Sequence, residues 1–215
     1  MKARDTSGFF DSYAHDFDAI YGGRQMIFNR LIDRLFRRSM RLRYRKTILG
    51  CHPVEGKTAL DIGCGPGHYG IALAKMGMET VWGVDFAPAM IEIAIKKAVA
   101  AEVESTSRFI VDDFLKFNFN RTFDYTILMG FMDYIVDPSA VIAKALSITT
   151  SKSFFSFPDS GGFLAWQRRR RYRRRCDLFM YRRDEIDKLF RGMPCASFEI
   201  EKISRDFFVT AHMSK

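Results

Sequence analysis

A glycine-rich segment that follows a predicted strand carries the clearest chemical signal in the sequence. In TALDIGCGPGHYG, Asp61 stands at the end of the strand, glycines follow at positions 63, 65 and 67, and a predicted helix comes next. Glycines at this spacing allow a tight turn and let a ligand approach the backbone N–H groups at the amino end of a helix. The segment therefore predicts a loop that binds a small ligand.

The residues around these glycines indicate the charge of the ligand. A dinucleotide-binding G-x-G-x-x-G motif would place its third glycine at position 68, where this chain has His68. Asp61, two residues before Gly63, would also repel the negative charge of a pyrophosphate. A positively charged ligand fits better, and S-adenosylmethionine carries an α-ammonium group and a sulfonium centre in place of phosphates.

Four segments of the chain occur in the order of a known enzyme family. LDIGCGPG resembles the first motif of the class I S-adenosylmethionine-dependent methyltransferases, and in VDFAPAM the second predicted strand ends at Asp85. FIVDDF contains Asp113, and FDYTILMGFMDYIVDP carries Met129 and Gly130 after the fourth predicted strand. Because the four motifs are in register, the resemblance is specific over about residues 56–158.

This resemblance implies a cofactor site at the carboxyl ends of the strands. Asp85 would bind the ribose hydroxyls, and Phe86 and Met90 would flank the adenine unless they pack in the core instead. Asp113 would accept a hydrogen bond from the adenine amino group, with Asp112 as the alternative. The residues implied to bind S-adenosylmethionine are Asp61, Gly63, Cys64, Gly65, Gly67, Asp85, Phe86, Met90, Asp113, Phe114, Met129 and Gly130.

The segment after the fourth predicted strand is the expected place of methyl transfer. This reaction is an in-line displacement at an activated carbon, so the protein mainly aligns the reactants and supplies a base for a hydroxyl acceptor. Many small-molecule members of the family carry paired histidines where this chain has Asp133 and Tyr134. Asp133 would deprotonate the acceptor or hold its amine, and Tyr134 would orient it. The alternative is a helix cap followed by a packed aromatic ring.

The same segment bears on the atom that is methylated. Family members that methylate adenine or glutamine amines usually carry an Asn/Asp-Pro-Pro-Tyr/Phe motif here, whereas this chain reads GFMDY. We therefore expect O-methylation of a small, anionic or amphiphilic acceptor, and a carboxylate acceptor would need no general base at neutral pH. Two alternatives stay open: an RNA methyltransferase that uses arginines on phosphates, and a non-catalytic S-adenosylmethionine-binding partner protein.

An aromatic segment near residue 15 is predicted to cover the site. Tyr13, Phe17 and Tyr21 are four residues apart, so they share one face of a predicted helix, and the Gly-Gly pair that follows could act as a hinge. His15 lies among them and is a candidate catalytic base. The hypothesis is a lid whose three rings contact the substrate.

Two basic segments carry more positive charge than the net charge of +9, so the rest of the chain carries −6. RRRRYRRR, at residues 168–175, contributes +7, and residues 24–46 contribute +8. Seven arginines in eight positions repel one another without a counter-ion, so we expect Arg168, Arg169 and Tyr172 to contact an anionic substrate at the site's mouth. A nucleic acid and a peripheral anionic membrane surface are the less favoured partners.

The elements that must position these residues follow a βα pattern. From Thr58 onward, short apolar runs alternate with amphipathic stretches, which predicts an α/β fold with a doubly wound, seven-stranded, mostly parallel sheet and an antiparallel C-terminal hairpin. We expect an N-terminal helical lid segment over residues 1–50 and a Rossmann-like methyltransferase domain over residues 51–215, with a basic insertion at about 160–182. This layout is loosely similar to that of the magnesium-protoporphyrin O-methyltransferases.

Composition excludes several other classes of protein. With 215 residues, 47% of them apolar and 27% charged, the chain can bury a core and is not a disordered segment. No apolar stretch approaches the roughly 20 residues of a membrane span, and the first residues lack a secretory pattern, so we expect a cytoplasmic protein. The four cysteines form no C-x-x-C pair, and we expect neither a metal site nor disulfides.

Overall fold

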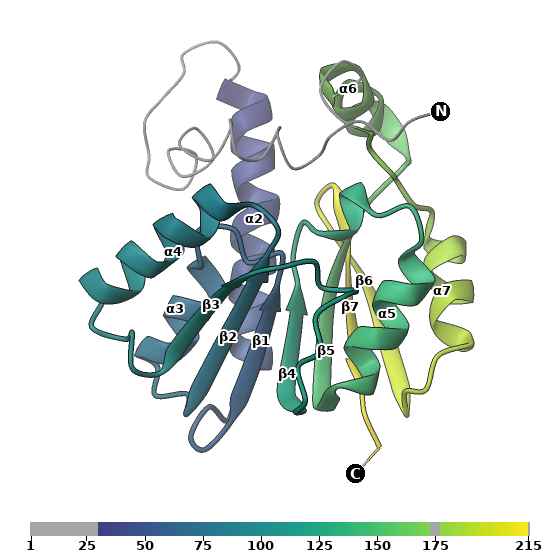
Figure 1. Ribbon diagram of the computed structural model, residues 1–215. Helices are drawn as coiled ribbons and strands as arrows, with labels where there is room; N and C mark the ends of the chain where they lie inside the picture. The colour runs from purple at the N-terminus through teal and green to yellow at the C-terminus, as the bar shows by residue number, and fades with distance from the viewer. Residues whose placement is uncertain (1–29, 173–176, 215) are drawn as a thin grey trace.

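The computed structural model describes residues 30–172 and 177–214, which fold around one seven-stranded sheet (Figure 1). The strands are β1 (Thr58–Ile62), β2 (Thr80–Asp85), β3 (Ser107–Val111), β4 (Phe123–Leu128), β5 (Thr149–Pro158), β6 (Ser197–Ile203) and β7 (Asp206–His212). Their order is β3-β2-β1-β4-β5-β7-β6, with β1 to β5 parallel and β7 antiparallel to both neighbours. The predicted fold class is confirmed.

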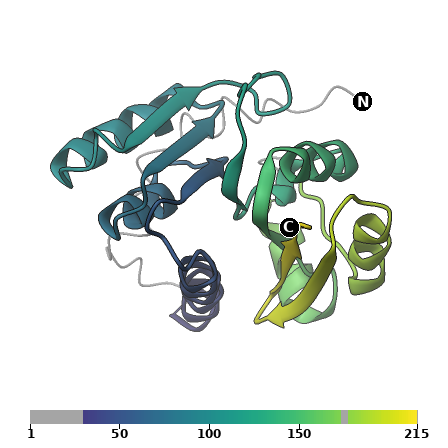
Figure 2. The same cartoon turned by 90° about the horizontal axis from the view of Figure 1, so that it is seen from below.

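Helices cover both faces of this sheet. They are α2 (Arg30–Gly50), α3 (His68–Lys75), α4 (Pro88–Ala100), the short 3-10 helix η1 (Met132–Tyr134), α5 (Pro138–Ser147), α6 (Gly162–Tyr172) and α7 (Arg183–Arg191). Helices α2 and α3 lie on one side of the sheet and α5 and α7 on the other, as Figures 1 and 2 show from two directions. Of the helices described, none is long and apolar enough to cross a membrane.

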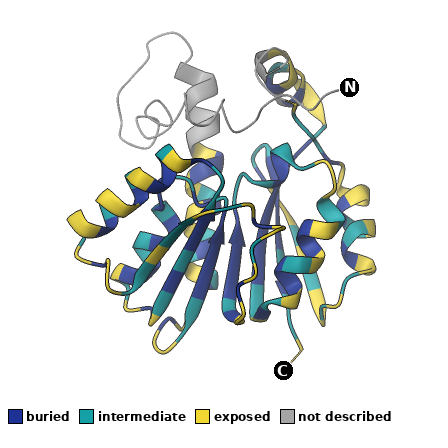
Figure 3. Ribbon diagram, viewed as in Figure 1, coloured by how far each residue is buried: buried dark blue, intermediate teal, exposed yellow. Residues whose placement is uncertain are grey.

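The central strands β1 and β4 are buried almost along their whole length, on both of their faces. On β1, Ala59 packs into the cluster on the side of α3, whereas the next residue, Leu60, packs into the cluster on the side of α5. Phe154 and Phe155 of β5 divide in the same way. Alternate side chains of one strand therefore pack into two different hydrophobic cores, one on each face of the sheet. This pattern is typical of a parallel sheet between helical layers (Figure 3).

Two helices extend past the sheet and shape the edge where β1 to β5 end. Helix α2 contacts α3 and β6 and continues upward beyond the strands in Figure 1. Helix α6 follows β5 directly and lies above the same edge, away from both sheet faces. The carboxyl ends of the parallel strands therefore lie between α2 on one side and α6 on the other.

Candidate functional site

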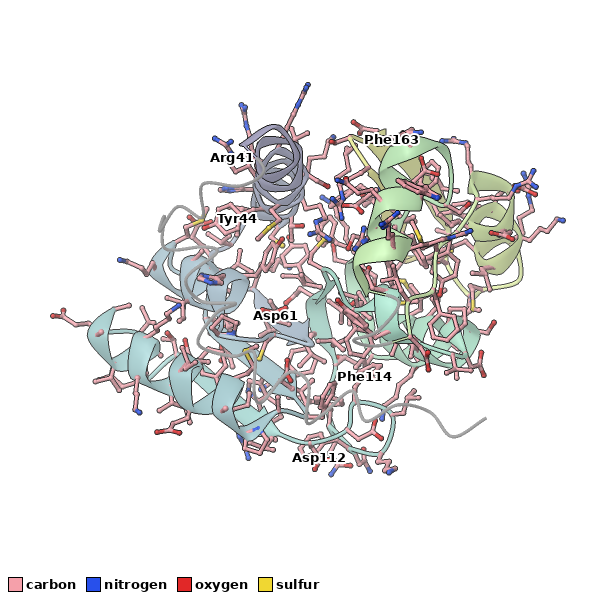
Figure 4. The ribbon with its side chains drawn as sticks, turned by 90° about the horizontal axis from the view of Figure 1, so that it is seen from above. Arg41, Tyr44, Asp61, Asp112, Phe114 and Phe163 are labelled. Atoms are coloured by element: carbon pink, nitrogen blue, oxygen red, sulfur yellow. The ribbon has the colours of Figure 1, made fainter. Side chains whose placement is uncertain are left out.

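A pocket of about 320 Å³ lies at this edge of the sheet. It collects residues from segments that are far apart in the sequence, and Figure 4 looks onto it with Asp61 near its centre and Phe114 to one side. The candidate site residues named from the sequence that line it are Asp61, Gly63, Cys64, Gly65, Asp85, Phe86, Met90, Asp112, Asp113, Phe114, Met129, Gly130, Asp133, Tyr134 and Arg168. Gly67 does not line the pocket and instead precedes α3 in a left-handed conformation.

The carboxyl group of Asp61 is the strongest indication of a cationic ligand. Its side chain is buried, and its Oδ2 has no hydrogen-bond partner among the residues that the structure describes. Burial, followed by the negative charge of Asp85, raises the pKa of Asp61 to about 8, against a smaller lowering by a backbone hydrogen bond at Gly70. A buried carboxylate without a cation is costly, so an ammonium group placed here would complete the site.

The glycine loop folds closely against the acceptor side of the pocket. Gly63 has φ +66°, and a Cβ at this position would lie 2.4 Å from the ring of Phe131. Its N–H group donates to the carbonyl of Val84 at 2.8 Å, which ties the loop to the end of β2. A side chain at position 63 would therefore be strained by its backbone and would displace Phe131.

Asp85 joins the two loops that surround the expected ribose position. Its Oδ2 accepts a hydrogen bond from Gly65 N at 2.9 Å, and its Oδ1 accepts one from Ala87 N at 3.0 Å. An ionised carboxylate offers about four lone-pair positions, so these two bonds are compatible with further bonds to a pair of hydroxyl groups. The position at the end of β2 fits the ribose role implied by the family resemblance.

The expected adenine end of the pocket combines apolar side chains with two carboxylates. Met90 and Phe114 are buried, and Phe86 packs on the small cluster that Met90 forms with Ala87. Asp112 is half-buried and accepts a bond from the N–H of Asp113, whose own side chain is exposed and caps Leu115 N. Both carboxylates line the pocket, so the choice between them for the adenine amino group stays open.

A buried ion-pair network, which we call the Arg168 network, forms the acceptor end of the pocket. Arg168 of α6 pairs through Nη2 with Asp133 of η1, and its Nη1 donates to Asp206 Oδ1 of β7 at 3.0 Å. Arg43 of α2 lies 3.7 Å from Asp206 Oδ2, to which Ser39 also donates a hydrogen bond. All five side chains are buried, so the network joins four separate elements inside the protein.

A hydrogen-bond chain connects this network to the loop after β4. Arg43 Nη1 donates to Ser156 Oγ at 3.1 Å, and the same oxygen accepts a bond from Gly130 N at 2.7 Å. Gly130 has φ +75°, which lets its N–H group turn towards β5. The backbone at Met129 and Gly130, where the family would place the methionine half of the cofactor, is therefore held from the acceptor side.

The pKa values of the two carboxylates in the Arg168 network are shifted in opposite directions. Burial alone would raise the pKa of Asp206, but Arg43, Arg168 and the Ser39 hydrogen bond outweigh it, so that pKa is lowered. For Asp133, burial exceeds the attraction of Arg168, and the pKa is raised. Asp133 Oδ1 has no hydrogen-bond partner among the described residues. Asp133 is thus the more basic carboxylate, and its buried Oδ1 belongs to a residue that lines the pocket.

The residues of the arginine run differ in whether they line the pocket. Arg168 lines the pocket with two carboxylates of the same chain as counter-ions, whereas Arg169 is exposed and does not line it. Tyr134 is half-buried and lines the pocket beside Asp133. The side chain of Tyr172 and the candidate lid residues Tyr13, His15, Phe17 and Tyr21 lie outside the described part of the chain.

Three residues at the acceptor end were not found from the sequence: Arg43, Phe131 and Asp206. Arg43 belongs to a stripe with Ser39 and Thr47 at i, i+4 and i+8, and all three are buried. A charged residue on an otherwise buried helix stripe was the available signal for Arg43. Neither Phe131 nor Asp206 has a local pattern that separates it from ordinary core or turn residues.

The comparisons with known proteins agree on one kind of fold and domain. A family model described as a methyltransferase domain matches residues 53–177. A ubiquinone biosynthesis O-methyltransferase of Alkalilimnicola ehrlichii is 31% identical over 103 residues, which are 48% of this chain and 40% of that protein. The chain therefore aligns with less than half the length of this curated relative.

Two solved structures are similar over nearly the whole chain. Magnesium protoporphyrin IX methyltransferase from Synechocystis PCC 6803, solved with bound S-adenosylhomocysteine, superposes with a TM-score of 0.79 at 19% identity and covers 97% of this chain and 98% of its own. Phosphoethanolamine N-methyltransferase 2 of Haemonchus contortus superposes with a TM-score of 0.76 at 14% identity, over 97% of this chain and 60% of its own. At these identities the similarity shows the fold.

We predict that Asp85→Ala weakens S-adenosylmethionine binding by about 1.5–3 kcal/mol, because charge-assisted hydrogen bonds to the ribose are lost. Isothermal titration calorimetry would measure the affinity. Asp184→Ala, which removes an exposed carboxylate at the start of α7, serves as the matched control and should leave the affinity unchanged. Equal affinity of Asp85→Ala and the unmodified protein would remove Asp85 from the ribose site.

The raised pKa of Asp61 predicts pH-dependent cofactor binding. Below its pKa of about 8, Asp61 is mostly protonated in the unliganded protein, and a cation binds the ionised form. Affinity for S-adenosylmethionine should therefore increase from pH 6 towards pH 8 by up to about tenfold per unit, with release of a proton. Calorimetry in two buffers of different ionisation enthalpy measures this release. Asp61→Asn should bind weakly and without this pH dependence, and an unchanged slope in that variant would contradict the assignment.

The sign of the same shift also fixes an effect on stability. The pKa of Asp61 is higher in the folded protein than its ordinary value of 3.8, so the folded state holds the proton between about pH 4 and pH 8. This residue therefore lowers the free energy of unfolding of the unliganded protein as the pH rises through that window. Saturating S-adenosylmethionine should reduce this loss, and urea unfolding at pH 6 and pH 8 would show it.

The Arg168 network predicts a large stability difference between two arginines of one helix. Arg168→Ala leaves Asp133 and Asp206 buried without their shared cation and should lower the free energy of unfolding by about 3–5 kcal/mol. Arg170→Ala, at an exposed position of α6, should change it by less than about 0.5 kcal/mol. Urea unfolding monitored by circular dichroism tests both, and similar effects of the two variants would contradict the network.

Proposed function

The chain belongs to the methyltransferase domain family, and from that premise we propose that it transfers the methyl group of S-adenosylmethionine to an oxygen atom of a small, anionic or amphiphilic acceptor. S-adenosylmethionine dependence itself follows from the family and from the fit of the pocket. Bound there, the cofactor supplies a methyl group on a positively charged sulfur. The residues of this chain must then bind the acceptor, orient it and manage its proton.

The observation that carries the proposal is the environment of Asp133. One carboxylate oxygen pairs with Arg168, and the other lies without a described partner in a residue that lines the pocket. Arg168 fixes the rotation of this carboxylate and favours its ionised form, while burial makes it a stronger base than an exposed aspartate. This combination supports removal of a proton from a hydroxyl group of the acceptor.

The rest of the acceptor end supports a compact substrate with apolar surface. Met40, Phe131 and Ile135 line the pocket together with Tyr134, whose hydroxyl would orient the acceptor. Apolar walls with a few convergent polar groups are typical of small-molecule sites. The similarity to a ubiquinone biosynthesis O-methyltransferase supports an aromatic or amphiphilic hydroxyl acceptor.

Charge at the acceptor end also bears on the substrate. Arg43 and Arg168 both line the pocket, and each interacts with an internal carboxylate. An acceptor carboxylate placed beside them would find guanidinium groups already oriented for charge-assisted hydrogen bonds. A hydroxylated aromatic acid combines this group with a hydroxyl for Asp133, and it is the acceptor class that we propose.

The test is methylation of a panel of hydroxylated aromatic acids, with and without an alkyl chain, using S-adenosylmethionine labelled in the methyl group. We predict a product heavier by one methyl group, and resistance of the label to alkaline hydrolysis would identify an ether over an ester. Asp133→Asn should lower kcat by about 100- to 10,000-fold and leave the cofactor affinity unchanged. Asp184→Asn is the control for removal of a carboxylate elsewhere.

Three results would contradict the proposal. If Asp133→Asn keeps its kcat with a hydroxyl acceptor, Asp133 is not the base. If RNA oligonucleotides are methylated with a higher kcat/KM than every acid of the panel, and this rate falls steeply with salt, the RNA methyltransferase alternative replaces the small-molecule enzyme. Binding of the cofactor without transfer to either class of acceptor would favour a non-catalytic binding protein.

A further inference from the structure

Helix α6 has two faces of opposite character. Its buried face carries Ala165 and Arg168, the second of which belongs to the ion-pair network of the pocket. On the other face, Phe163 is 70% exposed and Trp166 is 55% exposed. The helix is therefore held from beneath by buried ion pairs, while two large apolar rings remain in contact with water.

The two exposed rings form an organised surface. The rings of Phe163 and Trp166 stack with centroids 5.7 Å apart and an interplanar angle of 28°. The guanidinium carbon of Arg170 lies 5.7 Å from the centre of the Trp166 ring, and Arg169 is exposed beside them. We call Phe163, Trp166, Arg169 and Arg170 the aromatic–arginine face. The positions i, i+3 and i+7 of Phe163, Trp166 and Arg170 place these three on one side of the helix.

This face shares its end of the molecule with the second basic segment. Helix α2 exposes Arg38, Arg41 and Arg45, and it rises beyond the carboxyl ends of the strands, as α6 does (Figure 1). In Figure 4, seen from above, Arg41 on α2 and Phe163 on α6 lie towards the same edge of the view. Exposed arginines of α2 and exposed rings of α6 thus belong to the two helices that extend past the carboxyl ends of the strands.

We propose that the aromatic–arginine face docks the protein on the surface of an anionic lipid bilayer. Transfer of stacked aromatic rings out of water lowers the free energy, and Trp rings favour the level of the lipid headgroups. Guanidinium groups at the border of the rings can form charge-assisted hydrogen bonds with lipid phosphates and are attracted by the negative surface potential. An apolar centre with arginines around it is the pattern of a helix that lies in a membrane interface.

A nucleic acid fits the same face less well. Proteins that bind single strands present open ring faces on which successive bases stack, along a groove that follows the backbone. Here the Trp166 ring is already stacked on Phe163 and has Arg170 near it. Trp166 lines neither of the two pockets described, and Phe163 borders a separate pocket of about 230 Å³ together with Ala165 and Arg168. The aromatic–arginine face is therefore better suited to insertion into the headgroup region of a lipid bilayer than to stacking with nucleic-acid bases.

Membrane docking goes beyond the proposed methyl transfer and is tested without an acceptor. The full chain is mixed with vesicles of phosphatidylcholine alone or of phosphatidylcholine with phosphatidylglycerol, and bound protein is separated by flotation. We expect binding to the anionic vesicles, weak binding to the zwitterionic ones, and loss of binding at raised salt. The double variant Phe163→Ala/Trp166→Ala should lower the partition coefficient at least about tenfold, and Arg170→Gln about fivefold.

A matched control separates this face from exposed apolar surface in general. Ile95 and Val99 are 47% and 55% exposed on α4, at i and i+4, so Ile95→Ala/Val99→Ala removes a similar exposed apolar pair elsewhere. This variant should bind the anionic vesicles as the unmodified protein does. Unchanged affinity for S-adenosylmethionine in all variants shows that the fold is intact.

A second measurement uses the unmodified chain and needs no variant to fold. Brominated lipids quench tryptophan fluorescence at short range, and the chain has two tryptophans, Trp166 and the partly buried Trp82 under Arg108. Brominated anionic vesicles should quench part of the emission. Absence of both flotation and quenching would overturn the proposal, as would equal vesicle binding by Phe163→Ala/Trp166→Ala and the unmodified protein. Tighter binding of an RNA oligonucleotide than of the vesicles, lost in the same variant, would assign the face to nucleic acid.

Discussion

The acceptor side of the protein depends on one interaction, the pairing of the buried Arg168 guanidinium group with two carboxylates from distant parts of the chain. Asp133 follows β4 and Asp206 begins β7, so neither local sequence nor one element can bring them together. In a medium of low dielectric constant each charge needs its partners, because a single missing member leaves an uncompensated ion. The position of α6, the orientation of Asp133 and the contact with α2 are therefore parts of one arrangement.

The two ends of the pocket differ in how their charges are balanced. At the acceptor end, Arg43 and Arg168 face Asp133 and Asp206, and the carboxylates have cations within the protein. At the cofactor end, Asp61 is buried near Asp85, and their repulsion contributes to the raised pKa of Asp61. Among the residues that the structure describes, the pocket thus lacks positive charge at one end and is nearly neutral at the other. This asymmetry orients a cofactor whose cationic groups must meet Asp61, and it leaves the balanced end for the acceptor.

The fold and the cofactor loop could be predicted because their signals are local. Strands such as β1 and β4 are short, mostly apolar runs, and the glycines after Asp61 mark the turn to α3 within a few residues. The acceptor end could not be predicted in the same way, since Asp206 lies 38 residues from Arg168 and 167 from Ser39. Partners at such separations leave no periodicity in the sequence. The candidate lid residues around His15 lie outside the described residues, so their role stays a prediction.

The arginine run shows why composition alone gave an incomplete account of this region. In the sequence, a run of like charges looks like a single basic patch. A helix turns by about 100° per residue, so neighbouring positions face different surroundings. Arg168 points into the protein and neutralises two carboxylates, whereas Arg169 and Arg170 are exposed beside Trp166. Because the same helix forms a wall of the pocket, anything that binds its outer face acts on an element that is already fixed to Asp133. The insertion after β5 can therefore serve the site and an outside surface at once, without any change in its position.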